Sequence, residues 1–327
     1  MKRILITGAC ASLALAGCAK KKTTTTTGGG SSWLVGENGL MADLRITGEL
    51  GAGYDLDDNH DLLGITCRGL DTAFVVGELG TMLRTFDGGD SWEVIDLGTT
   101  ATLRSVASGG VTWEGAASPG TDSIYVAGDR TLMMSSDSGA TWTHLPGEAA
   151  HDWLAVAADR TAVTAFALDT AGEVWRYDAA HAAGAMIASL PAARVVTTSR
   201  DGAHLAVAGS GDAILRSDDG GATWRSVELG RALELEDAWV TGAGVVVAVG
   251  AGGTIARVDA QDAVAITAPA TATLRAVHLD SRGQGVAAGD AGTVLTTIDG
   301  GATWTQLHLA LTGTVLGVDE VSSDGAL

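Results

Sequence analysis

Short apolar runs that end in a turn residue recur along the chain at a nearly constant interval. Brief hydrophobic stretches of this kind, separated by Gly, Asp, Ser and Thr, are typical of short β-strands. The runs are Leu34-Val35-Gly36, Val75-Val76-Gly77, Val126-Ala127-Gly128, Ala167-Leu168-Asp169, Val207-Ala208-Gly209, Ala248-Val249-Gly250 and Ala287-Ala288-Gly289. The steps between them are 41, 51, 41, 40, 41 and 39 residues. This spacing predicts seven repeats across residues 33–327, each of about 40 residues with four short strands.

Four repeats also contain an eight-residue motif, Ser/Thr-x-Asp-x-Gly-x-Thr/Ser-Trp. Its fixed residues are Asp87, Gly89 and Trp92; Asp137, Gly139 and Trp142; Asp219, Gly221 and Trp224; and Asp299, Gly301 and Trp304. In a strand–turn–strand the Asp carboxylate accepts turn N–H groups, the Gly adopts a positive φ, and the Trp packs over the hairpin. We therefore expect these Asp residues to be structural, with a catalytic role as the alternative.

The two ends of the repeat region complement each other. The segment Leu316-Gly317-Val318-Asp319 repeats the strand motif found at residues 103–106 and 274–277, whereas Trp33-Leu34-Val35-Gly36 begins at the strand that follows this motif. A blade assembled from both ends would close a ring and leave no open sheet edge. A linear solenoid would need capping repeats instead. The sequence predicts an all-β, seven-bladed β-propeller closed by its N- and C-terminal strands.

The eight-residue motif resembles the Asp box of BNR-type repeats. The stretch from Val76 to Trp92 is similar to the photosystem II stability/assembly factor-like group, whose pattern is Val-x-Gly-x-x-Gly-x-Ile/Leu-x-Arg-Ser/Thr-x-Asp-Gly-Gly-x-Thr-Trp. The resemblance covers essentially the whole chain after Ser32. It implies a propeller with Asp boxes at the blade periphery and an arginine patch for partner contact, but fold alone does not define a role.

The first 32 residues have the pattern of a processing signal and a tether. Lys2 and Arg3 precede an apolar stretch that ends in Leu15-Ala16-Gly17-Cys18, which resembles the bacterial lipobox. We expect a signal peptide at residues 1–17, lipidation of Cys18, and a flexible Lys/Thr/Gly/Ser tether over residues 18–32. Ala19 after the Cys resembles the pattern sorted to the outer membrane. An ordinary secretory signal is the alternative.

Composition narrows the classes of partner. Lys and Arg number 20 against 39 Asp and Glu, which gives a formal net charge of -19. Nucleic-acid binding needs clustered basic residues, so this balance argues against it. Hydrophobic residues make up 46% of the chain, enough to build a core.

Arginine side chains are the candidate binding residues. Arg104 and Arg275 lie on predicted innermost strands, next to the channel of the propeller, and we expect them to border a binding face. In four of the repeats an arginine lies seven residues after the marker position: Arg84, Arg176, Arg216 and Arg257. Arg84, Arg216 and Arg257 are secondary binding candidates, and pairing with a nearby Asp inside a blade is the alternative for this set.

Glycan handling is the alternative function, because Asp-box propellers include sialidases and other glycoside hydrolases. Hydrolysis uses paired carboxylates, or in sialidases a Tyr nucleophile with a Glu and an arginine cluster. The tyrosines are Tyr54, Tyr125 and Tyr177, the last two in or after repeat strands. Exposure of Trp113 and Trp153 on one face would favour sugar binding.

Cofactor and metal signals are sparse. The segment from Asp55 to Asp61 has the acidic spacing that begins an EF-hand loop, but it lacks Gly at the sixth position and Glu at the twelfth, so we expect a solvated acidic loop. No His pair has a metal-ligand spacing with a third ligand. We expect no cofactor and no metal, and the function predicted is that of a lipid-anchored cell-envelope propeller, a non-catalytic scaffold that binds an envelope protein.

Overall fold

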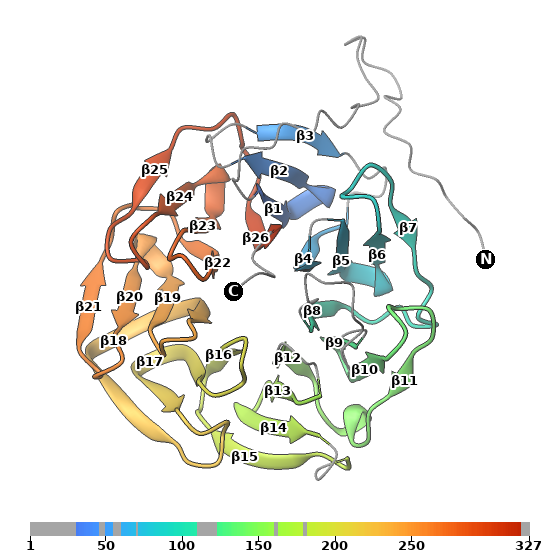
Figure 1. Cartoon of the computed structure of the whole chain (residues 1–327), viewed down its shortest axis with the longest axis horizontal. Helices are drawn as coiled ribbons and strands as arrows, with labels where there is room; N and C mark the ends of the chain where they lie inside the picture. The colour runs from blue at the N-terminus through green and yellow to red at the C-terminus, as the bar shows by residue number, and fades with distance from the viewer. Residues whose placement is uncertain are drawn as a thin grey trace.

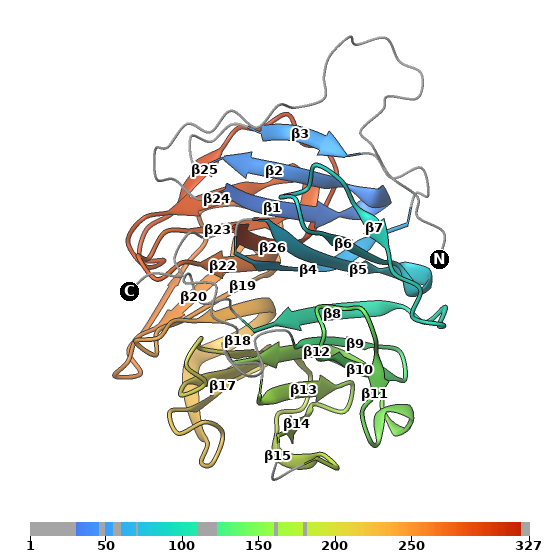
Figure 2. The same ribbon diagram turned by 45° about the vertical axis from the view of Figure 1, so that its right-hand side comes forward.

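The computed structural model is a ring of antiparallel β-sheets around a central axis (Figure 1). It describes residues 31–45, 50–54, 60–69, 71–109, 123–159, 163–178 and 182–321. Within each sheet, successive strands are arranged from the axis to the rim (Figure 1), and Figure 2 shows the sheets side by side around the ring. No helix in these residues is long and apolar enough to cross a membrane.

Five of the sheets have four strands each. The first contains both ends of the described chain, in the order β26 (Val315–Val321), β1 (Ser31–Gly36), β2 (Met41–Arg45) and β3 (Leu50–Tyr54). The second is β4 (Leu62–Arg68), β5 (Thr72–Gly77), β6 (Met82–Thr85) and β7 (Glu93–Val94). The third is β8 (Leu103–Ser108), β9 (Ile124–Gly128), β10 (Thr131–Ser135) and β11 (Thr143–His144).

The remaining sheets complete the ring. One is β12 (Trp153–Ala158), β13 (Ala165–Asp169), β14 (Glu173–Tyr177) and β15 (Ala185–Ser189). The six-stranded sheet is β16 (Ala193–Thr198), β17 (Leu205–Ser217), β18 (Arg225–Val240), β19 (Val246–Gly250), β20 (Ile255–Val258) and β21 (Val264–Thr267). The last is β22 (Leu274–Leu279), β23 (Gly285–Gly289), β24 (Val294–Thr297) and β25 (Thr305–Leu307). Short 3₁₀ turns lie at η1 (Glu37–Gly39), η2 (Glu78–Gly80), η3 (Glu148–Ala150), η4 (Ala251–Gly253) and η5 (Asp290–Gly292).

The predicted number of blades is wrong. Counted by hydrogen-bonded sheets, the described propeller has six blades and not seven. The fifth and sixth sequence repeats share one sheet, because β18 continues from the fifth repeat into the sixth. It pairs with β17 on the way, with Ser210 opposite Glu234 and Gly211 opposite Leu233, and then with β19. Sequence spacing counts repeats, but it does not show whether the hydrogen-bond ladder breaks between two of them.

Closure of the ring by the two chain ends is confirmed. Strand β26 pairs antiparallel with β1, with Trp33 opposite Asp319 and Leu34 opposite Val318. Strand β1 begins at Ser31, within the segment expected as tether. The first sheet therefore leaves no unpaired edge between the beginning and the end of the described chain.

The core lies between neighbouring sheets. The second strand of a sheet is covered on both faces, and β9, β13 and β19 are buried at every position. Such strands are continuous runs of Val, Ala, Ile, Leu and Phe, as expected for a layer that is packed on both sides. Backbone approach is close here too: a Cβ added at Gly250 would lie 1.9 Å from the carbonyl oxygen of Glu234. This explains why the apolar runs end in glycine.

Candidate functional site

The central channel is a concave site in the described part of the chain. It encloses about 650 Å³ and is lined by the innermost strand of each sheet, with the six-stranded sheet contributing two, β16 and β18. The wall is rich in backbone and small side chains, but charged residues gather at it. Arg68, Arg104, Arg194, Arg200 and Arg275 all line the channel.

A β-bulge gives each innermost strand one unpaired residue near its start. In β8, for example, Leu103 pairs with Gly128 and Ser105 with Ala127, so that Arg104 has no partner across the ladder. Bulges redirect side chains out of the regular alternation and are common beside functional sites. The equivalent residues all line the channel, and we call them the mouth ring: Leu63, Arg104, Leu154, Arg194, Glu236, Arg275 and Leu316.

The mouth ring has a charged arc and an arc of leucines, and Arg104 on β8 lies within the second arc, between Leu63 and Leu154. Arg194, Glu236 and Arg275 follow one another on β16, β18 and β22, whereas Leu316 and Leu63 lie on the neighbouring strands β26 and β4. The innermost strands of all the sheets start at the same end of the propeller, so the mouth-ring side chains near these starts lie at one opening of the channel. The opening can therefore present cations and an apolar surface together.

Each arginine of the mouth ring forms an ion pair. Arg104 pairs with Asp129, and Nη1 of Arg194 donates to the two carboxylate oxygens of Glu236 at 3.0 and 2.8 Å. Nε of Arg275 donates to Asp290 at 2.5 Å, and this hydrogen bond raises the pKa of Arg275 above its ordinary value. The Arg104 and Arg275 side chains are each 36% exposed. In addition, Nε of Arg104 has no hydrogen-bond partner in the described chain.

Buried polar groups support the wall below the mouth ring. Asp237 accepts the N–H groups of Val277 and Ala238, both at 2.8 Å, and burial raises its pKa to about 6. Burial also lowers the pKa of His278, whose Nε2 lies 3.1 Å from a carboxylate oxygen of Asp319. These contacts tie successive innermost strands together, so the channel wall is held rigid.

The other predicted arginines lie away from the channel wall. They hold a turn of the following repeat: Arg84 donates to the carbonyl of Ser138 at 2.9 Å and Arg257 to that of Gly300 at 3.1 Å. Arg216, 2% exposed, donates to the carbonyl of Asp259 at 2.7 Å and pairs with Asp262 at 3.0 Å. The alternative of pairing with a nearby Asp also occurs, from Arg176 to Asp178 at 2.5 Å and from Arg216 to Asp218 at 3.1 Å. The carbonyl acceptors were not predicted, because they lie more than 40 residues further along the chain.

The Asp of each eight-residue motif organises its own turn. In the third motif Asp219 accepts the N–H of Thr223 at 2.8 Å and its hydroxyl at 2.5 Å. Such hydrogen bonds lower the pKa of the motif residues Asp137, Asp219 and Asp299 to about 2. The same hydrogen bonds recur at Asp87. Each carboxylate is thus engaged by its turn.

Three of the motif Trp residues make a matching hydrogen bond. Nε1 donates to the carbonyl of the motif Gly, from Trp142 to Gly139 at 3.2 Å, and the same bond joins Trp224 to Gly221 and Trp304 to Gly301, both at 3.1 Å. Trp92 differs: its Nε1 has no partner in the described chain, and its ring packs edge-on against Trp33 with centroids 5.6 Å apart.

Residues considered for glycan chemistry lie in the core where the structure describes them. Trp153 is fully buried, and Tyr125 and Tyr177 are 3% and 5% exposed. Burial raises the pKa of these two tyrosines to about 12, which works against a nucleophilic phenolate. Trp113, residues 55–59 of the acidic loop, Cys18 and the signal and tether up to residue 30 lie outside the described residues. Among the described residues, the group His151, Asp169 and Glu173 has ligand atoms close enough to hold a metal ion.

Comparisons with known proteins identify the fold. No family model and no curated protein matches the chain. Solved structures do match, and one is YCF48 bound to D1 peptide, with a TM-score of 0.61 and 17% identity over 81% of this chain and 94% of that chain. The fold is that of the YCF48 propellers. YCF48 from Cyanidioschyzon merolae gives a TM-score of 0.60 at 15% identity, covering 79% of this chain and 88% of that chain.

The same architecture also occurs in a differently named protein. A chain of a nidogen/laminin complex matches with a TM-score of 0.55 at 11% identity, over 90% of this chain and 99% of that chain. Identities this low establish the architecture alone. The role of the chain must therefore be argued from its own site.

Proposed function

We propose that the chain is a non-catalytic scaffold that binds a polypeptide segment at the mouth ring. The observation that carries this proposal is the set of bulged residues at one opening of the channel, which combines Arg104, Arg194 and Arg275 with Leu63 and Leu316. Guanidinium groups bind carboxylates by charge-assisted hydrogen bonds. An acidic and partly apolar protein segment matches this opening.

The ion pairs of the mouth ring allow such an exchange at small cost. Arg104 and Asp129 are 36% and 40% exposed, and Arg275 and Asp290 are 36% and 33% exposed. Exposed pairs contribute about 0–1 kcal/mol each, so a carboxylate of a partner can replace the resident Asp. The leucines of the ring then gain apolar contacts that water does not offer.

Comparison with solved structures supports a protein partner. YCF48, which has the same fold, is known in a structure bound to D1 peptide. A rigid ring with one charged opening is suited to hold a segment of another protein during assembly. We extend this role to an envelope protein as the partner of the present chain.

The proposal is tested by cross-linking the native protein in its own membranes and identifying co-purified species by mass spectrometry. The test variant replaces Arg104 and Arg275 by Ala, and the control replaces Arg225, an exposed arginine that does not line the channel. We expect one stoichiometric protein with the wild type and the control, and its loss with the double variant. Equal capture by all three, or capture of polysaccharide without protein, would contradict the proposal.

We further propose that the propeller is held at the cell envelope by lipid on Cys18, in the outer membrane. The lipobox-like residues Leu15 to Cys18 and the polar run after them support this anchor. Labelling cells with an alkyne fatty acid provides the test. We expect label in the wild type and none after Cys18→Ser. No label in the wild type would indicate an ordinary secretory signal instead, and retained label in the variant would indicate attachment at another residue.

A further inference from the structure

The fourth sequence repeat breaks the rule that its strand β13 should end in glycine. Equivalent positions are Gly in the other repeats, because a Cβ there would lie within about 2 Å of a backbone carbonyl, as at Gly128 with the oxygen of Thr102 at 2.1 Å. Position 169 is an Asp that is 1% exposed. A buried carboxylate costs free energy unless it is fully paired. A departure from a repeat rule at such a cost points to a specific role.

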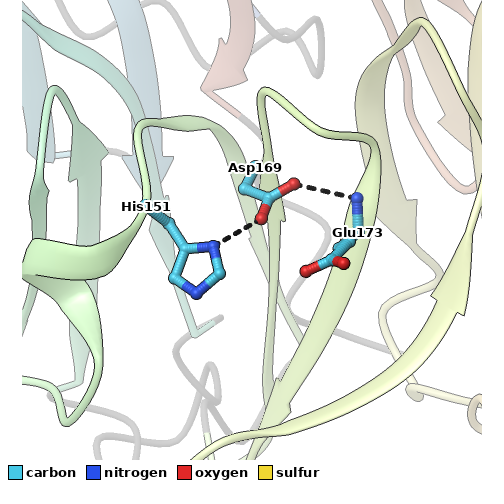
Figure 3. A group of neighbouring side chains, drawn as sticks. All are labelled: His151, Asp169 and Glu173. Atoms are coloured by element: carbon cyan, nitrogen blue, oxygen red, sulfur yellow. Dashed lines mark hydrogen bonds and ion pairs between the residues drawn. The ribbon is translucent and has the colours of Figure 1, made fainter.

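Asp169 lies in a group of three metal-ligand side chains. His151 precedes β12, Asp169 ends β13, and Glu173 begins β14, so three neighbouring segments of one sheet bring them together. Their ligand atoms all lie within 4.8 Å of one another. Figure 3 shows the Glu173 carboxylate beside the space between Asp169 and the His151 ring. The group is not evident in the sequence, because Asp169 follows His151 by 18 residues and precedes Glu173 by four.

The two oxygens of Asp169 have different roles. Oδ1 accepts the N–H groups of Ala171 and Glu173, at 3.0 and 2.9 Å, which fixes the orientation of the carboxylate. Oδ2 lies 2.6 Å from Nδ1 of His151. The Glu173 carboxylate makes no hydrogen bond or ion pair within the described chain. One oxygen, one imidazole nitrogen and one unengaged carboxylate therefore face each other.

We propose that His151, Asp169 and Glu173 bind a divalent transition-metal ion of the zinc type. Imidazole nitrogen together with carboxylate oxygen is a donor set that suits Zn²⁺, with water completing the coordination. Metal bonds of about 2.1 Å at a tetrahedral angle place two ligand atoms about 3.4 Å apart. The Nδ1 of His151 and Oδ2 of Asp169 need to separate by less than about 1 Å to admit the ion.

The surroundings favour a defined site. The His151 ring packs against Trp153 and Trp175, with centroids 5.0 and 4.9 Å apart, so its orientation is restricted. Trp153 is itself fixed by a hydrogen bond from Nε1 to the carbonyl of Glu148 at 3.1 Å. Support of this kind holds metal ligands in place. Because Leu154 of the mouth ring follows Trp153 directly, the ion would lie at the same end of the propeller as the channel opening.

The experiment measures Zn²⁺ binding to the untagged full chain by titration calorimetry after treatment with EDTA, with Ca²⁺ as a comparison ion. Glu173→Gln is the test variant, because it removes a carboxylate that makes no hydrogen bond or ion pair in the described chain. Glu228→Gln, at an exposed position in the first half of β18, is the matched control. We expect one Zn²⁺ per chain in wild type and control, and at least tenfold weaker binding in the test variant.

Thermal unfolding gives a second measurement. Zn²⁺ should raise the midpoint of the wild type and of Glu228→Gln, but not that of Glu173→Gln, because only a bound ligand stabilises the fold. Equal Zn²⁺ affinity in wild type and Glu173→Gln, equal responses to Zn²⁺ and Ca²⁺, or no binding at millimolar Zn²⁺ would each overturn the proposal. His151 and Asp169 would then be an ion pair that neutralises a buried carboxylate.

Discussion

Arg216 offers the sharpest test of how neighbouring repeats are held together. Its side chain is 2% exposed and contacts Asp218 at 3.1 Å, Asp262 at 3.0 Å and the carbonyl of Asp259 at 2.7 Å. Arg225 pairs with the same two carboxylates, at 2.5 Å for Asp218 and 2.8 Å for Asp262, but is 41% exposed. The two arginines thus differ in burial while sharing their partners.

The expected magnitudes follow from that difference. Removing one partner of a fully buried ion pair costs about 3–5 kcal/mol, because the other charge remains buried. Asp218 and Asp262 are 34% and 33% exposed and keep Arg225, so part of this cost is absent. We expect Arg216→Met to lower the free energy of unfolding by about 2–3 kcal/mol. Arg225→Met should lower it by about 1 kcal/mol or less.

The assay is urea unfolding followed by tryptophan fluorescence, since urea leaves ion pairs unscreened. Arg216→Met should clearly lower the urea concentration at the unfolding midpoint. Added salt should reduce the difference in midpoint between this variant and the wild type only slightly, because Arg216 is buried. The gap for Arg225→Met should close in salt. Equal shifts for the two variants, or a loss under about 0.5 kcal/mol for Arg216→Met, would refute the argument that burial sets the strength of this contact.

Three further changes probe other parts of the fold. The folded pKa of Asp219, about 2, lies below the ordinary 3.8, so this carboxylate contributes stability above pH 4 that is lost toward pH 2. Asp219→Asn should therefore reduce the slope of the melting midpoint between pH 4 and pH 2, and an unchanged slope would contradict this. The pKa of Asp237 is shifted in the opposite direction, from 3.8 up to about 6, so its carboxylate destabilises the fold at neutral pH. The free energy of unfolding of the wild type, relative to that of Asp237→Asn, should therefore rise by about 1 kcal/mol from pH 7 to pH 5, and a fall would refute this. Gly289→Ala places a Cβ 2.0 Å from the carbonyl oxygen of Thr273 and should cost about 1–3 kcal/mol in urea unfolding, whereas Gly242→Ala enters open space; equal losses would contradict the steric argument.

Features that depend on local turn chemistry could be predicted from the sequence. The Asp and Gly spacing of the eight-residue motif anticipates the hydrogen bonds that Asp137 accepts from Thr141, because all the atoms involved lie within five residues. Ring closure was also predictable, since the motif at residues 316–319 completes the one that begins at Trp33. Both inferences rest on patterns that recur inside the chain.

Features that depend on strand register could not be predicted. The number of sheets differs from the number of repeats because β17 and β18 pair across a connection, which depends on backbone direction at residues 210–211. The candidate site was seen only in part: Arg104 and Arg275 lie in the channel wall, but Arg194 and Glu236 were missed. A bulge has no signature in composition, so only the ladder shows that these residues occupy equivalent positions.

The bulges also explain how the repeats of this chain can share one backbone structure while the side chains at the channel opening differ. A mouth-ring residue is outside the ladder, so the same position accepts Leu63, Arg104 or Glu236 without loss of a backbone hydrogen bond. Residues at the rim cannot be substituted in this way, because Asp219 and Arg216 hold turns on which the packing of the next repeat depends. Changes in partner preference can therefore occur at the channel opening while the fold is unchanged. The proposed binding role therefore assigns the specificity of this propeller to the mouth ring.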